Sequence, residues 1–442
     1  MTRGVPRRVA QTAVVAGASM AGLCAARVLS DRFDEVVVID RDTLPDADRW
    51  RAQVPQGRQP HLLLHAGAQL LEEWFPGITE ELYEGGAVEL DVCHDFYWHQ
   101  GGGVLTSPPS ALRGPMMSRP LLEATVRRRL ARIPCVTLRD RTAVEGLVPD
   151  GTGTRIAGVR LAGRPPVRCD LIVDATGRRA RSLGWLKELG YGPPPRSVVT
   201  VDTHYASRVH RREGTTARDW KAAAVIGRPD TRRLAMALPL EHGRWIILLV
   251  GVNGEVPPTD DEGRLAFARS LESPVIADLM ATAEPLADPV AHRFPSNQRR
   301  HLDRMRRFPL GWVMLGDAVA SCNPVYGQGM TSAAQQAAAL GECLDHTRTL
   351  DLAFARRYFG AAARTVAAPW SLAAGGDFAY AGTTGPKPAG TDLLNRYMRR
   401  VVLAAQHDDA VGIRFGEVAG LVRRPEWLLT PPFLLRVLRS AH

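Results

Sequence analysis

The chain has 442 residues, of which 45% are apolar and 23% are charged, a composition that excludes disordered and fibrous proteins. The formal charge of +10 is carried almost entirely by arginine, since the only lysines are Lys187, Lys221 and Lys387. No run of about five or six basic residues with interleaved aromatic residues occurs, so we expect a charge spread over solvated faces and no nucleic-acid binding. The basic clusters at residues 127–129 and 299–307 adjoin apolar segments and predict exposed helix faces.

Cysteine usage points to a reducing cytoplasm. The cysteines lack the spacing of a metal site or a disulfide framework, so we expect no metal; they are Cys24, Cys93, Cys135, Cys169, Cys322 and Cys343. No run of about 18 apolar residues exists, so we expect no membrane span. The basic and then apolar N-terminus is similar to an export signal, but the apolar pattern resumes as EVVVID, which favours a strand, a glycine turn and a helix.

Residues 12–42 predict a strand, a helix and a second strand with a phosphate-binding turn between the first two. The turn reads Gly17-Ala-Ser19-Met-Ala-Gly22, a variant of the dinucleotide fingerprint. Gly17 permits the tight turn, Ser19 is small enough for a pyrophosphate to approach, and Gly22 permits close helix–strand packing. Asp40 ends the second strand, where an acid accepts hydrogen bonds from a ribose. This motif does not separate FAD from NAD, and the alternative is a plain turn in a doubly wound domain.

The middle of the chain predicts an aromatic strand, an amphipathic helix and a second mixed sheet. CHDFYWHQGGG (93–103) is the aromatic strand, and MMSRPLLEATVRRRL (116–130) is a helix with Arg119 near its start. VRCDLIVDATGRRARS (167–182) is a buried strand that ends in Asp174-Ala-Thr-Gly177. Segments 198–209, 232–241 and 243–252 predict sheet strands, and 261–274 predicts a helix.

The stretch GWVMLGDAVASCNPVYGQGM predicts a buried strand, a Gly316-Asp317 turn, a loop stiffened by Pro324 and a helix that begins near Gly329. The positive end of that helix could stabilise negative charge on a bound ring. Cys322 has no cysteine partner nearby and is interpreted as a packing residue. A Gly/Pro-rich linker at 375–390 precedes a final helical region.

In this order, the motifs resemble the flavoprotein monooxygenases of the para-hydroxybenzoate hydroxylase type over most of residues 12–375. That family carries an N-terminal glycine fingerprint, a central Asp-containing motif and a late Gly-Asp motif followed by a Pro and a GQG-like loop. The segment VPQGRQPHLLLHAGAQLLEEWFPG (54–77), with DATGR and GDAVASCNPVYGQGM, is similar to the bacterial flavin epoxidases of polyether pathways. The resemblance implies an α/β fold with a discontinuous Rossmann-like FAD-binding domain, a mixed-sheet substrate domain and a C-terminal helical region.

The resemblance implies FAD as the cofactor, with NADPH or NADH as the reductant, used directly or through a partner flavin reductase. It places the pyrophosphate at Gly17, Ser19, Met20, Ala21 and Gly22, and the adenosine ribose at Asp40 beside Arg41. Arg119 would lie near the phosphate and ribityl groups, Val144 would face the adenine through its backbone, and Asp317 would accept from the ribityl chain. The isoalloxazine would be wrapped by Pro324, Gly327, Gln328, Gly329 and Met330.

The implied domains are an FAD-binding domain at 1–85, 115–195 and 295–375, a substrate domain at 86–114 and 196–294, and a C-terminal helical region at 376–442. The central motif departs from the family pattern, because Asp174 is followed by Ala rather than Gly, which leaves direct use of NADPH open. Flavin halogenases are less similar, because the chain has no Trp-x-Trp and no lysine in its early region. A disulfide oxidoreductase would need a cysteine pair that is absent, and geranylgeranyl reductases are a weaker resemblance.

The resemblance implies a monooxygenase that inserts one oxygen from O₂ into a polyketide-like natural product through a flavin C4a-hydroperoxide. Alkene epoxidation and aromatic hydroxylation both stay open, and an apolar cavity without a base would favour epoxidation. The alternatives are a flavin-dependent reductase or dehydrogenase of an isoprenoid or polyketide, and a non-catalytic flavoprotein.

Candidate substrate-binding residues are Phe96, Tyr97, Trp98, Met236 and Phe294, with plain core packing as the alternative. His61 is a candidate contact near flavin or substrate, or else a histidine at a helix start that is satisfied by the backbone.

Overall fold

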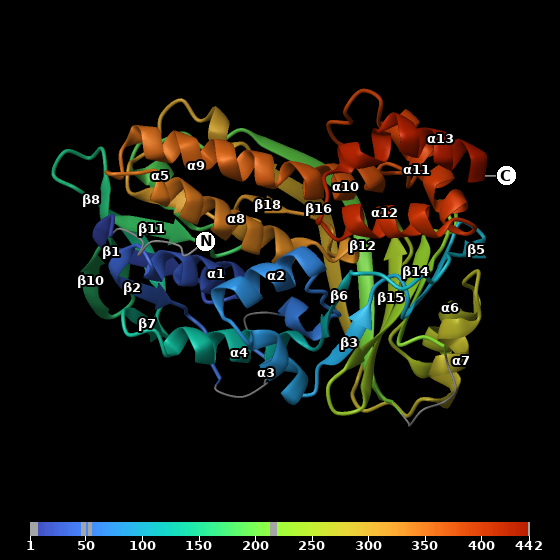
Figure 1. Cartoon of the computed structure of the whole chain (residues 1–442). Coiled ribbons are helices and arrows are strands. Elements are labelled where there is room, and N and C mark those ends of the chain that lie inside the picture. The colour runs from blue at the N-terminus through green and yellow to red at the C-terminus, as the bar shows by residue number, and fades with distance from the viewer. Residues whose placement is uncertain (1–7, 46–49, 52–54, 213–218, 441–442) are drawn as a thin grey trace.

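The structure is a computed structural model that describes residues 8–45, 50–51, 55–212 and 219–440. Val54, which begins the epoxidase-like segment, lies outside these ranges. A parallel sheet with its helices forms one half of the molecule, a large mixed sheet forms the other, and the C-terminal helices sit beside the mixed sheet (Figure 1). This arrangement confirms the predicted fold class.

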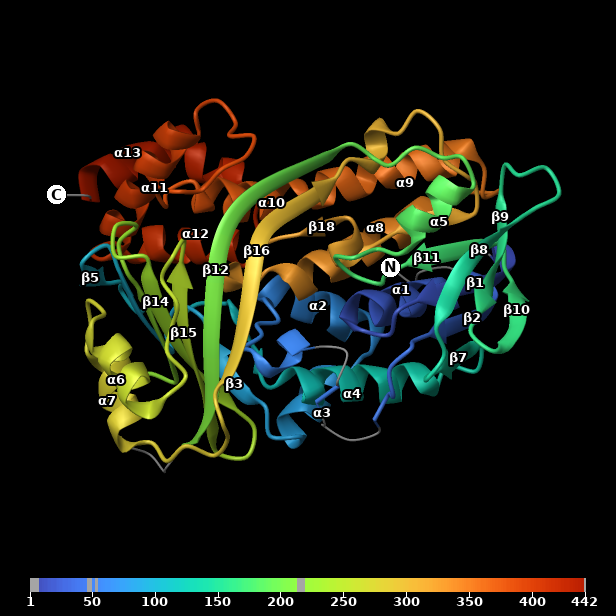
Figure 2. The same ribbon diagram turned by 180° about the vertical axis from the view of Figure 1, so that it is seen from behind.

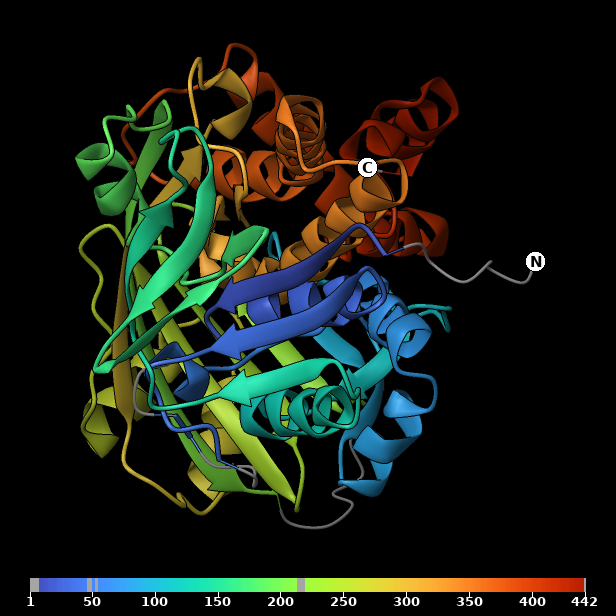
Figure 3. The same ribbon diagram turned by 90° about the vertical axis from the view of Figure 1, so that its left-hand side faces the viewer.

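The parallel sheet is built from short strands, and all of them except the edge strand β7 are apolar and buried at their carboxyl ends. Its order is β17 (Trp312–Met314), β11 (Leu171–Asp174), β1 (Ala10–Ala16), β2 (Phe33–Ile39) and β7 (Val136–Arg139). Helices α1 (Met20–Ser30) and α4 (Arg119–Ala131) cover one face, and α8 (Gly329–Asp345) packs on α1. The antiparallel sheet of β8 (Val144–Pro149), β9 (Ile156–Leu161) and β10 (Arg164–Arg168) forms the neighbouring layer (Figure 3).

The mixed sheet confirms the three strands predicted between residues 198 and 252, and the helix predicted at 261–274 is present but ends at Arg269. Its order is β18 (Ala320–Ser321), β16 (Val290–Arg300), β12 (Arg196–Arg211), β15 (Arg244–Val252), β14 (Arg233–Leu240), β13 (Ala222–Ile226), β4 (Phe96–Gln100) and β5 (Gly103–Val104). Figure 2 shows β12 and β16 as two long strands that run from this sheet toward the other half. Helices α6 (Asp261–Arg269) and α7 (Val275–Thr282) pack on one face, so the other face is turned toward the parallel-sheet half.

The remaining elements connect or cover these layers. They are α2 (His65–Trp74), α3 (Ile78–Glu84), β3 (Val88–Asp91), β6 (Arg113–Met116), α5 (Ser182–Glu188), α9 (Leu352–Thr365), α10 (Ala367–Asp377), α11 (Thr391–Ala405), α12 (Asp409–Ala419) and α13 (Pro431–Ser440), with the short turns η1 (Pro55–Arg58), η2 (Leu302–Arg304), η3 (Gly316–Ala318), η4 (Pro324–Tyr326) and η5 (Pro425–Leu429). Helices α11 to α13 share an apolar core of their own. Within the described ranges, no helix is both long and apolar enough to cross a bilayer.

Two expectations about the basic clusters were wrong. Residues 299 and 300 end strand β16 instead of lying on a helix. Arg300 is buried, and it donates hydrogen bonds to the carbonyl oxygens of Ala318 and Arg178 at 2.6 and 2.7 Å. Arg127 lies on a helix as predicted but is also buried, and it donates to the Pro45 carbonyl at 2.6 Å. Backbone carbonyls therefore satisfy arginines that composition alone assigns to the surface.

Candidate functional site

The glycine turn between β1 and α1 has the geometry that a dinucleotide requires. Gly17 has φ +104°, and a Cβ added there would lie 2.6 Å from the Ala175 carbonyl oxygen. A Cβ on Gly22 would lie 1.8 Å from the Gly17 carbonyl oxygen, so only glycine fits at either position. The Ser19 side chain does not cap α1, which leaves the N–H groups of the first turn, at Met20 and Ala21, free of a side-chain cap.

Asp40 lies beside this turn and is held by a buried arginine that the sequence reading did not single out. Its carboxylate accepts from the backbone N–H groups of Ala18 and Asp42 at 2.6 and 2.9 Å, and it pairs with Arg51 at 2.8 Å. A carboxylate offers about four acceptor positions, so one remains for a ribose hydroxyl. Arg41 is exposed. Val144 is buried at the start of β8. It lies near Asp40 at the end of β2, because the N–H of Thr142 donates to the Asp40 carbonyl at 2.9 Å.

Glu123, on α4, is the second side chain missing from the sequence prediction. It is almost completely buried, accepts from the Ser19 hydroxyl at 2.7 Å and pairs with Arg119 at 2.9 Å and with Arg51 at 3.4 Å. Burial alone would raise its pKa, but the charges of Arg119 and Arg51 and the Ser19 hydrogen bond lower the pKa to about 2. Glu123 therefore stays ionised and fixes both arginines.

Arg119 and His61 meet in this cluster. Arg119 donates to Glu123, to the Ser19 hydroxyl at 2.5 Å and to His61 Nε2 at 2.9 Å, which leaves about two of its five N–H groups for a ligand. His61 Nδ1 lies 2.8 Å from the Gln59 carbonyl oxygen, so Nδ1 carries the proton and Nε2 accepts. Burial and the Arg119 charge lower the His61 pKa to about 3. His61 is thus a neutral residue with both nitrogens occupied.

The Gly316-Asp317 turn joins the fingerprint helix. Gly316 has φ +70°, and a Cβ there would lie 2.6 Å from the Ala21 Cβ. Its N–H donates to Gln336 of α8 at 3.0 Å. The Asp317 side chain is accessible to solvent, yet many protein atoms surround it. A side chain that lines a concave surface has both properties. This enclosure raises its pKa, against the opposing charges of Arg119 and Arg178.

The loop of residues 323–327, together with the start of α8, lies next to this turn. Gly327 has φ +68°, and a Cβ there would come within 3.0 Å of Leu62, so the epoxidase-like segment packs on the loop. A Cβ on Gly329 would meet nothing within 4 Å, which leaves open space at the first residue of α8. Met330 is buried, and the Gln328 side chain is buried and donates to the Ala419 carbonyl at 3.2 Å. Only the backbone of Gln328 can therefore face a ring at Gly329.

The mixed sheet presents an apolar wall to this loop. Phe96, Trp98 and Met236 belong to one apolar cluster that includes Leu62 and Val325. Phe294 belongs to a second cluster that also reaches Val325, and the Arg178 guanidinium lies 5.1 Å from its ring centre. Tyr97 lies on the opposite face, where its hydroxyl is 3.1 Å from the Ser273 hydroxyl and its ring packs with Trp220. Successive side chains of a strand point to opposite faces, so Tyr97 does not share the wall of its neighbours.

The residues present fit an FAD molecule at this junction. Gly17 and Gly22 leave no room for a side chain, and the first turn of α1 lacks a side-chain cap. Asp40 and Arg119 can each form further hydrogen bonds. Open space at Gly329, and at Gly177 after β11, leaves room for a flat group at the other end. Of the residues proposed for the cofactor, Arg41 is exposed, the Gln328 side chain donates to Ala419, and the Met330 side chain lies in the core.

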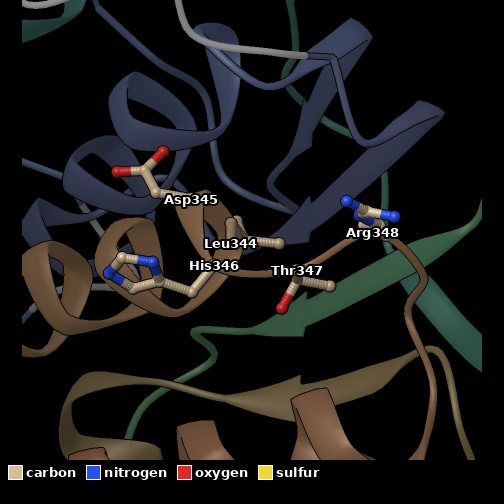
Figure 4. A pocket seen from close by; sticks show the side chains of 5 residues that line it. All are labelled: Leu344, Asp345, His346, Thr347 and Arg348. Atoms are coloured by element: carbon tan, nitrogen blue, oxygen red, sulfur yellow. The ribbon is translucent and has the colours of Figure 1, made fainter.

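A small hollow elsewhere on the molecule does not belong to this site. It is lined by consecutive residues at the end of α8: Leu344, Asp345, His346, Thr347 and Arg348 (Figure 4). Helix α8 has 17 residues, which places its two ends about 25 Å apart. Asp345 is engaged in an ion pair with Arg32 at 2.8 Å. The hollow therefore lies at the C-terminal end of α8, away from the proposed cofactor site.

Comparison with known proteins supports FAD as the cofactor. The sequence profile of the family described as FAD binding domain matches residues 10–349. A protein of Mycobacterium tuberculosis (strain ATCC 25618 / H37Rv), Protein Rv3254, is 36% identical over 385 residues, which are 83% of this chain and 80% of that protein. The p-nitrophenol 4-monooxygenase PnpA from Pseudomonas putida DLL-E4 has a similar structure, with a TM-score of 0.64, 16% identity and coverage of 94% of this chain and 99% of that one. The flavin-dependent halogenase CmlS superposes with a TM-score of 0.60 and 16% identity over 93% of this chain and 76% of that one.

Proposed function

Because the chain belongs to the family of FAD binding domains, we propose that it is an FAD-dependent monooxygenase of a polyketide-like natural product. The bound flavin would supply the reaction with O₂, after reduction by NADPH or NADH directly or through a partner reductase. The chain's own residues would hold the cofactor at Gly17 to Gly22, Asp40, Arg119 and Asp317. We also propose that residues 86–114 and 196–294 form the substrate domain, and that the chain is related to the bacterial polyether-pathway epoxidases.

The observation that carries this proposal is the apolar wall opposite the 323–327 loop. Phe96, Trp98 and Met236 belong to the apolar cluster that reaches the loop, and two polar groups near it are already engaged. His61 is neutral with both nitrogens occupied, and the Tyr205 hydroxyl donates to Asn323. Neither of these two groups is free to act as a base, which suits an alkene better than a phenol, whose hydroxyl must lose a proton. We therefore favour epoxidation over aromatic hydroxylation.

The lysines argue against halogenation, the activity of one structural neighbour. Lys187 is exposed on α5, Lys221 pairs with Asp95 at 2.9 Å, and Lys387 pairs with Asp392 at 2.5 Å. These positions lie outside the apolar wall and the 323–327 loop. The chain therefore offers no lysine beside the proposed reaction space.

The test is oxygen incorporation. The purified chain with FAD and NADPH is incubated under ¹⁸O₂ with a panel of polyketide alkenes and phenols. The molecular masses of the products are then measured by mass spectrometry. One labelled oxygen atom in an alkene product is the expected result. Oxidised product without label would instead establish a dehydrogenase, and a halogenated product in added bromide would overturn the argument from the lysines. Parallel incubations with NADPH alone, and with NADPH plus an added flavin reductase, separate direct reduction from reduction by a partner.

A further inference from the structure

Asp377, at the end of α10, is a buried carboxyl group that the proposed reaction does not use. It is 0% exposed and accepts hydrogen bonds from Asn297 at 2.6 Å, from Asn323 at 3.1 and 3.3 Å and from the Tyr326 hydroxyl at 3.0 Å. Among the described residues, no lysine, arginine or histidine pairs with it. A buried carboxylate without a cation lowers stability, so its presence calls for a specific structural or functional role.

The donors to Asp377 all belong to the 323–327 loop or to its support. Asn323 and Tyr326 are loop residues, and Asn297 of β16 accepts from the Asn323 backbone N–H at 2.7 Å. The Asn323 side chain also accepts from the Val325 N–H at 3.3 Å and from the Tyr205 hydroxyl. A Cβ on Gly376 would lie 2.6 Å from the Tyr326 hydroxyl, so glycine there lets α10 approach the loop. Asp377 thus anchors the loop from α10, beside the contacts that Asn323 makes with Asn297 and Tyr205.

We propose that Asp377, in its ionised form, is a positioning residue that holds the 323–327 loop in the conformation required to bind FAD. This inference rests on the proposed assignment of residues 324–330 to the flavin and does not depend on the reaction. An ionised carboxylate can accept from all three neighbouring side chains at once. Once protonated, it would present a proton to groups that are themselves donors, and the loop would lose part of its anchor.

Asp377 should therefore make FAD binding depend on pH. Burial raises its pKa to about 6, and the hydrogen bonds from Asn297, Tyr326 and Asn323 oppose this shift. The titratable groups around Asp377 are Tyr205, Tyr326, Tyr380 and Cys322, and burial followed by the Asp377 charge raises the pKa of Tyr326 and Tyr380. Asp317 is the other carboxyl group near the loop, and it is unchanged in a variant of Asp377.

The experiment measures the FAD dissociation constant of the full-length native chain, of Asp377→Asn and of Asp345→Asn between pH 5 and 8, by flavin fluorescence. In Asp377→Asn we expect an affinity weaker by about tenfold at pH 7.5, as for the loss of one charge-assisted hydrogen bond. The native affinity should fall below about pH 6, and this part of the pH profile should be absent in Asp377→Asn. Asp345→Asn removes a surface ion pair and should behave like the native chain.

Two further variants keep the outcomes distinct. Gly329→Leu fills the open space at the start of α8 and should weaken FAD binding if the loop assignment is right. If Gly329→Leu binds FAD weakly but Asp377→Asn keeps the native affinity and pH profile, the role of Asp377 is overturned and the loop assignment is not. Native affinity in both would overturn the loop assignment. Tyr326→Phe removes one donor and should reproduce part of the Asp377→Asn effect, whereas a general folding defect would show as a lower unfolding temperature without FAD.

Discussion

His61 is held in a single neutral tautomer, because Nδ1 donates to Gln59 and Nε2 accepts from Arg119. Its pKa of about 3 lies below the ordinary value of 6.5, so protonation favours the unfolded chain between these pH values. We predict that the Cε1–H NMR signal of His61, identified by its absence in His61→Gln, does not shift between pH 5 and 8. A shift centred near pH 6.5 would restore His61 as a candidate base.

Glu123 makes the opposite contribution to pH dependence from a histidine. Its pKa is lowered to about 2, so its stabilising effect is complete above the ordinary value of 4.5 and is lost as the pH falls toward 2. Replacement by Ala removes the carboxylate that pairs with Arg119, while Arg51 keeps its pair with Asp40, and we expect a loss of about 3–5 kcal/mol in the free energy of unfolding at pH 7.

Urea denaturation of the native chain and Glu123→Ala at pH 7, 4.5 and 3 checks this prediction. The difference between the two chains should narrow as the pH falls, because effects of other carboxyl groups cancel in the comparison. Glu188→Ala, an exposed change on α5, is the matched control and should cost less than about 0.5 kcal/mol. An equal difference at all three pH values would contradict the assigned role.

Strand β4 illustrates what one element does with consecutive aromatic residues. Phe96 and Trp98 face the proposed reaction space, and Tyr97 faces α6 and α7. We predict that Tyr97→Phe lowers the free energy of unfolding by about 1 kcal/mol, the value of its hydrogen bond with Ser273, without changing the Michaelis constant of the substrate. Trp98→Phe should change that constant. Equal effects of both changes on substrate binding would mean that the two faces are not separate.

Local patterns were sufficient to predict the elements that we propose for cofactor binding. Helix α1 lies at Met20–Ser30, and β11 and β17 are short apolar runs that end at the predicted turns. Partners from distant segments were not predictable in the same way. Arg51 contacts Asp40 and Glu123, and Asp377 contacts the 323–327 loop, but neither residue stands in a motif with a recognisable period or spacing. The alternation of Tyr97 and Trp98 could have been read from the two-residue period of a strand.

At the scale of the whole molecule, the proposed cofactor site spans the parallel sheet. Asp40 follows β2 and Asp317 follows β17, with β1 and β11 between them. Strands lie about 4.8 Å apart, so the two carboxylates are separated by roughly 14 Å across the sheet. An extended dinucleotide can reach both ends, and a mononucleotide cannot.

We therefore predict that FAD stabilises the chain and that FMN at the same concentration does not. At a free concentration about 100 times its dissociation constant, FAD should add about 2.7 kcal/mol to the free energy of unfolding. Thermal denaturation followed by circular dichroism checks this difference. Equal stabilisation by FMN would show that the adenosine end of the site contributes no binding energy.

The contact between α11 and the β4–β5 hairpin has a consequence for solubility. Gln406 donates to the Gln100 carbonyl at 2.8 Å, and Thr106 N–H donates to the Ala405 carbonyl at 3.0 Å. Strand β5 is the outer strand on one side of the mixed sheet, and exposed outer strands pair readily with other chains. By engaging backbone groups next to this strand, the C-terminal helices would guard the sheet against edge-to-edge aggregation.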